Sequence, residues 1–167
     1  MATFDAYTPI VALLVHDTDA NGIRAVINAV SAALIPESGV VVSRERFAAA
    51  PRRAGPPSSS VAVIPVAERD PIPVGIGWDE VAEAFEVEVT VRRKDLARGA
   101  TTLSTLKAAL RAIRDHYRGT AIAITGVTMR AISVGAIRVD GEPEADEIAH
   151  GVVPMTWRYL LERRANS

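Results

Sequence analysis

The stretch Phe85-Glu86-Val87-Glu88-Val89-Thr90-Val91, followed by a helical pattern from Leu103 to Tyr117, decides the fold class. In the first stretch apolar and polar residues alternate, which predicts a strand with one face on a core and the other in water. In the second, apolar residues fall at positions 103, 106, 110, 113 and 117. This spacing predicts an amphipathic helix, which we expect Thr101 or Thr102 to cap and Gly119 to end.

An earlier apolar stripe predicts a first helix of about four turns. Its members are Ile23, Val26, Ile27, Val30 and Leu34. The polar cluster His16-Asp17-Thr18-Asp19 precedes it and suits helix capping, and we expect Pro36 and Gly39 to stop it before a strand begins at Val40.

Residues 44–80 differ in composition from the helical segment before them, because Pro, Gly, Ser and Arg dominate the first part of residues 44–80. Such a composition cannot build a packed core, so we expect a long extended arm or hairpin with a short apolar run, Val61 to Val66. Pro71, Pro73, Gly75 and Gly77 are expected to break regularity again.

The last third alternates like strands from Ile122 to Val139 and from Val153 to Leu161, with a shift of phase at Gly135 that indicates a bulge. An acidic turn, residues 140–147, separates the two parts. The order of elements therefore predicts one α+β domain over residues 1–167, with two amphipathic helices on one face of a mainly antiparallel sheet.

Composition narrows the function classes. The 167 residues are 49% hydrophobic and 23% charged, as in an ordinary globular domain. The chain has no cysteine, which excludes disulfides, a thiol nucleophile and Cys-ligated metal sites. A net charge of −1 argues against a protein that coats nucleic acid. With no basic leader and no apolar run of about 20 residues, we expect a soluble protein made in a cytoplasm.

The sequence offers no catalytic or metal-binding set. Its three histidines are scattered, and His16 is best explained by capping. The acidic turn lacks the central glycine of a calcium loop, and Gly75-Ile76-Gly77 does not lead into a helix as a dinucleotide-binding loop does. We therefore expect no enzymatic activity and no cofactor.

The segment from Phe85 to Leu161 resembles the tail terminator (tail completion) proteins of long-tailed bacteriophages, the family of the phage lambda terminator. The resemblance is carried by the charged strand entering the second helix, the strand segments from Ile122 to Val139, and the acidic turn before the strand from Val153 to Tyr159. The first helix and the arm also occupy the expected places.

This resemblance implies a homo-oligomeric, hexameric ring in the virion, at the junction of tail and neck. The ring caps the tail tube protein, ends tube growth and docks the head connector or stopper protein, while genomic DNA passes through its lumen without specific binding. No membrane is involved.

Charged residues supply the candidate contacts of such a ring. Candidate subunit contacts are Glu86, Glu88, Arg92 and Arg93, candidates for the partner-docking arm are Arg44, Arg46, Arg52 and Arg53, and candidates for lining the channel are Asp140, Glu142, Glu144, Asp146 and Glu147. Each set has a plainer reading, which is a solvated sheet face, a soluble loop and a surface turn, respectively.

Other function classes remain open. A head-closure or connector protein of the phage neck would form a similar ring. A small ligand-binding regulatory α+β domain would need an apolar pocket with a few convergent polar groups. An enzyme is the third class, and it lacks a visible nucleophile, base or metal set.

Overall fold

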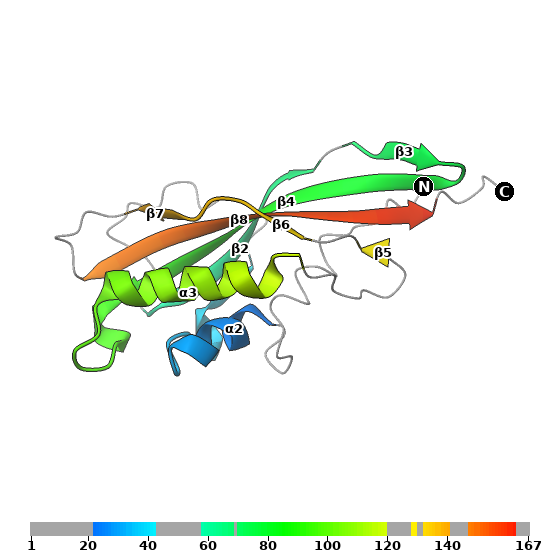
Figure 1. Ribbon diagram of the computed structural model, residues 1–167. Helices are drawn as coiled ribbons and strands as arrows, with labels where there is room; N and C mark the ends of the chain where they lie inside the picture. Colours follow the sequence, from blue (N-terminus) through cyan, green and yellow to red (C-terminus); the bar gives the residue numbers. More distant parts are fainter. Residues whose placement is uncertain are drawn as a thin grey trace.

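The computed structural model of the chain describes residues 22–42, 58–68, 70–119, 128–129, 132–140 and 147–162. Two α-helices, α2 (Ile23–Val30) and α3 (Thr102–Tyr117), lie on the same side of a mostly antiparallel sheet (Figure 1). This confirms the α+β fold class expected from the sequence. Within the described residues, no helix is long and apolar enough to cross a membrane.

Two long strands form the centre of the sheet. The strands β4 (Trp78–Arg92) and β8 (Ile148–Glu162) each have 15 residues and pair antiparallel over their whole length. The sheet runs in the order β1 (Val40–Val42), β2 (Ser60–Glu68), β4, β8 and β5 (Thr128–Met129). The short strand β3 (Ile72–Gly75) pairs with the beginning of β4, and β6 (Ser133–Val134) and β7 (Arg138–Asp140) pair with β8. The pairing of β1 with β2 is parallel.

The hydrophobic core lies between the sheet and the helices. Alternation in β4 and β8 turns one row of apolar side chains from each strand toward the helices, as the sequence predicted. The ring of Trp157 lies in the middle of this layer, with its centroid 6.5 Å from that of Phe85 and 6.4 Å from that of Tyr117. These aromatic contacts tie β8 to β4 and to α3. Glu83 is a buried carboxylate on this face, and its Oε1 accepts a hydrogen bond from the hydroxyl of Tyr159 at 2.9 Å. The buried apolar residues of β4 and β8 on this face are Val81, Phe85, Val87, Val89, Val91, Ala149, Val153, Met155, Trp157 and Tyr159.

Helix α3 begins and ends where its sequence predicts. The side chain of Thr101 accepts a hydrogen bond from the backbone N–H of Ser104, which satisfies an amide of the first turn. At the other end Gly119 adopts a φ of 70°, a left-handed conformation that favours glycine. Leu106, Leu110 and Ile113 are fully buried against the sheet and α2.

Helix α2 is shorter than expected. It ends at Val30, although the apolar stripe extends to Leu34. The side chain of Asn28 explains the difference, because its Oδ1 accepts from the N–H of Ile35 and its Nδ2 donates to the carbonyl of Ile35. These bonds hold a turn in which Ala33 has a φ of 55°, and they return Leu34 and Ile35 to the core. The turn that follows includes the short 3-10 helix η1 (Glu37–Gly39).

The sheet face away from the helices is partly buried, which corrects the expectation that this face is exposed to solvent. On this face Ile64 is 0% exposed, Val152 4% and Glu86 8%. Glu86 is paired with Ile64 in the register of β2 and β4, so an apolar side chain lies beside the carboxylate. The strand β2 is buried on both faces over Val61 to Ile64, which explains its continuous apolar run.

The described part of the expected arm is largely strand. Residues 60–68 form β2, and residues 72–80 form a hairpin of β3 and β4 that turns at Ile76 and Gly77. The expectation that Pro71 to Gly77 breaks regularity is met in part: the register shifts between Pro73 and Gly75 and the chain turns at Ile76 and Gly77, but Pro73 itself is accommodated in a short edge strand. Residues 43–57 lie outside the described part of the chain, as does the capping cluster at positions 16–19.

The phase shift expected near Gly135 is present. Val134 pairs with Met155 and Arg138 with Val152, so four steps along the edge strand match three along β8. Within the acidic turn only Asp140 and Glu147 are described, and residues 120–127 also lie outside the described ranges.

Candidate functional site

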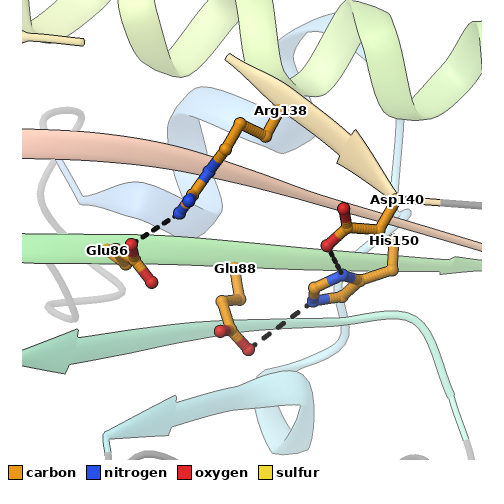
Figure 2. Close-up of polar contacts among 5 residues, drawn as sticks. All are labelled: Glu86, Glu88, Arg138, Asp140 and His150. Atoms are coloured by element: carbon orange, nitrogen blue, oxygen red, sulfur yellow. Dashed lines mark hydrogen bonds and ion pairs between the residues drawn. The ribbon is translucent and has the colours of Figure 1, made fainter. Parts of the chain in front are cut away.

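A polar cluster crosses the sheet face away from the helices, and it contains two of the predicted contact residues (Figure 2). The guanidinium of Arg138 on β7 donates to Oε1 of Glu86 on β4, with 2.5 Å between Nη2 and Oε1. The Glu86 side chain is only 11% exposed, whereas that of Arg138 is 55% exposed. The cation reaches from the edge strand across β8 and neutralises a carboxylate that the fold buries.

The imidazole of His150 lies between two carboxylates in the same cluster. Its Nε2 is 3.5 Å from Oε2 of Glu88, and its Nδ1 is 3.5 Å from Oδ2 of Asp140 (Figure 2). The hydrogen bond with Glu88 raises the pKa of His150 above its ordinary value. Partial burial opposes this increase, and the negative charges of Glu88 and Asp140 reinforce it. Protonated His150 therefore links β4, β8 and β7.

Three of the four candidate subunit contacts, Glu86, Glu88 and Arg92, point to the same face of β4, and Arg93 directly follows the strand. Glu86 and Glu88 are engaged within the chain, as described above. The backbone N–H of Arg92 donates to Oγ of Ser59, and the side chain of Arg92 is half-buried at the end of β4. Arg93 is exposed in the short helix η3 (Arg93–Asp95), where its Nη1 lies 3.5 Å from the carbonyl oxygen of Ala100.

The other candidate residues are only partly described. Asp140 is exposed and contacts His150, and Glu147 is exposed in the turn directly before β8. The arm residues Arg44, Arg46, Arg52 and Arg53 and the turn residues Glu142, Glu144 and Asp146 lie outside the described ranges. Their roles stay predictions.

An exposed apolar hairpin was missed by the sequence analysis. Ile72 and Val74 on β3 are 57% and 45% exposed, Trp78 at the start of β4 is 39% exposed, and Ile76 in the turn is fully exposed. The signal was present in the sequence, because apolar residues alternate with Pro73, Gly75 and Gly77. Pro73, Gly75 and Gly77 are turn formers, so they mask this period of two.

The side chains of the polar cluster form ion pairs within the chain. Within the described ranges, no group of three or more His, Asp or Glu side chains is arranged to hold a metal ion. His150 places one ring nitrogen toward each of two carboxylates, so the three side chains do not converge on a common point (Figure 2). The arrangement holds the edge strand β7 on β8 and β4.

Comparisons with known proteins identify the fold. No protein-family model matches the chain, and no curated protein matches it. A chain in the solved structure of the virion of a native gene transfer agent particle has a similar fold, with a TM-score of 0.54 and 15% sequence identity. The match covers 96% of this chain and 99% of that chain. The two chains thus share one fold over nearly their whole lengths.

Proposed function

We propose that this protein is a structural virion component that forms a ring on the end of a tail tube, ends tube growth and presents a docking surface for the head or neck. The observation that carries the proposal is the fold shared with a virion chain, which leaves only a few per cent of either chain unmatched. The pattern of strands and helices that resembles the tail terminators points to the same role.

In this proposal the protein acts by binding rather than by chemistry. One side of the ring fits the last ring of tail tube protein, and the other side fits the head connector or stopper protein. A ring of this kind is closed by two different surfaces on each copy, related by a rotation. Growth ends because the far side of the ring does not repeat the surface that a tube subunit offers.

DNA passes through the lumen without specific binding, and the acidic turn that contains Asp140 and Glu147 is the candidate lining. Negative charge there would repel the phosphate backbone. The protein would be located at the junction of tail and neck, as a homo-oligomer, which we take to be a hexamer. It would need no cofactor and no membrane.

Mass measurement and electron microscopy test the proposal. The purified chain is examined alone and after mixing with tail tubes, by native mass spectrometry and negative-stain images. We expect a closed ring on one end of each tube, and tubes that stop lengthening when more tube protein is added. Monomers that leave tube growth unchanged would contradict the proposal.

The same experiment separates the neck connector from the tail terminator. A ring that binds the head connector but does not bind tube ends would favour a head-closure protein. A monomer that binds a metabolite with a stoichiometry of one would favour a ligand-binding regulatory domain.

A further inference from the structure

The hairpin of β3 and β4 extends past the helices (Figure 1). It exposes apolar side chains. We call Ile72, Val74, Ile76 and Trp78 the hairpin tip. In the register of the sheet, Ile72 pairs with Glu80 and Trp78 pairs with Glu162. The tip is apolar at its centre, and an exposed apolar patch of this kind marks a surface for binding a partner.

The described charges around the hairpin tip are mostly acidic. In the described segments 70–80 and 158–162, four charged residues are carboxylates (Asp70, Asp79, Glu80 and Glu162) and one is a cation, Arg158, which pairs with Ala82 in the register of β4 and β8. Asp70 and Glu162 are exposed. Within the described ranges the surface is therefore apolar with a net negative border, so it favours a partner that offers cations next to apolar stems.

The outer face of α3 has the opposite charge. Its members lie four, three and four positions apart, which aligns them along one side of the helix, and we call them the basic stripe: Lys107, Arg111, Arg114 and Arg118. Asp115 is the single acidic residue in the described segment 102–119, and Nε of Arg114 lies 2.7 Å from its Oδ1. The stripe keeps a net positive charge.

We propose that the hairpin tip of one copy docks on the basic stripe of the next copy in the ring, a contact that rests on the proposed ring function. The two surfaces have complementary charge and lie on different parts of the fold. A contact between two different surfaces of the same chain passes from copy to copy and closes on rotation.

The chemistry of the side chains suits this contact. The indole of Trp78 offers a flat face on which an arginine of the stripe can stack, and Trp and Arg are both enriched at protein interfaces. Pro73 has no N–H to offer at the edge of β3, so side chains rather than added strand pairing carry the contact. The long stems of Lys107 and Arg111 can cover Ile72 and Val74.

Charge reversal on full-length protein tests the contact. One variant carries Asp70→Lys and Glu162→Lys, and the other carries Lys107→Glu and Arg111→Glu. All four positions are exposed, so circular dichroism should be unchanged. We expect each variant alone to need at least about tenfold more protein for half-assembly, because like charges then meet. We expect an equimolar mixture to restore the ring from equal numbers of the two variants, by native mass spectrometry.

Each outcome has one meaning. If wild-type protein forms rings and both variants do so equally well, the contact lies elsewhere and the ring function stands. If the mixture fails to restore rings, the pairing of tip with stripe is wrong. If reversal at the tip abolishes only the binding of tail tubes, the tip belongs to the tube and the inference is overturned. If wild-type protein stays monomeric even on tubes, the proposed function itself fails.

Discussion

Gly151 of β8 lies so close to Leu110 of α3 that a Cβ on the glycine would be 2.6 Å from Cδ1 of Leu110. The same Cβ would be 3.0 Å from the carbonyl oxygen of Arg138 on the neighbouring edge strand. Glycine at this position is therefore what allows α3 to approach the middle of the sheet while β7 stays paired.

Gly151→Ala is expected to lower the free energy of unfolding by about 1–3 kcal/mol, because the leucine can shift but the backbone carbonyl cannot do so cheaply. Urea denaturation at a concentration that keeps the protein monomeric measures the change. Gly75→Ala is the matched control, since nothing lies within 4 Å of a Cβ there. The control should change stability by no more than about 0.5 kcal/mol. Equal effects at the two positions would contradict the close-packing argument.

Asp95 anchors the beginning of β2 to the turn after β4. Its Oδ2 accepts hydrogen bonds from the backbone N–H of Ser59 at 2.6 Å and from Oγ of Ser59 at 2.8 Å, and Ser59 is fully buried. Asp95→Ala leaves a buried N–H without this acceptor, so we expect a loss of about 1–3 kcal/mol in the free energy of unfolding. Asp95→Asn keeps an acceptor oxygen and should lose clearly less. If Asp95→Ala and Asp95→Asn lower the free energy of unfolding equally, the hydrogen bonds to Ser59 are not what makes Asp95 stabilising.

The position of His150 between Glu88 and Asp140 makes stability depend on pH. Its pKa in the folded state is raised, above all by the hydrogen bond with Glu88. The stabilising contribution is therefore fully present below the pKa of the unfolded chain, about 6.5, and is lost as pH rises through the raised value. Because the imidazole is 33% exposed, we expect the contribution to be no more than about 1 kcal/mol.

The measurement is the free energy of unfolding of wild-type protein and His150→Gln between pH 5 and 9. The difference between them should be largest at the acidic end and should shrink toward a constant at the alkaline end. Glu88→Gln should weaken the same pH dependence without removing the imidazole. A difference that grows with pH would show that the neutral imidazole is the stabilising form.

The features of the fold that depend on nearby residues are predictable from the sequence. The alternation in β4, the cap at Thr101 and the stop at Gly119 depend on residues a few positions away, and each appears where the sequence predicts it. The end of α2 is not predictable in this way. It depends on Asn28 folding back on the backbone of Ile35, and the apolar period continues past the turn.

The candidate site is less predictable, because the contacts of its side chains are made with residues far away in the sequence. Glu86 reads as a solvent-facing residue of an alternating strand, but its environment depends on Arg138, which is 52 positions away. No local pattern around Glu86 contains Arg138. The hairpin tip is different, because its strand pairing is local: Ile72 pairs with Glu80, and the apolar residues alternate in the sequence, but Pro73 and Gly77 are turn formers and mask that period.

Mutating Arg138 should destabilise the protein more than mutating Glu86, although the two side chains form one ion pair. Arg138→Ala leaves a carboxylate that is 8% exposed beside Ile64, whereas Glu86→Gln leaves a guanidinium that is largely in water. We expect the first change to lower the free energy of unfolding by about 1.5–3 kcal/mol and the second by clearly less, because the loss of an ion-pair partner is costlier for a buried charge than for an exposed one. Denaturation of both single variants and of the double variant provides the coupling energy. If Glu86→Gln costs as much as Arg138→Ala, the burial of the carboxylate does not set the balance. If the double variant is less stable than the sum of the two single changes predicts, the pairing itself is not what joins β7 to β4.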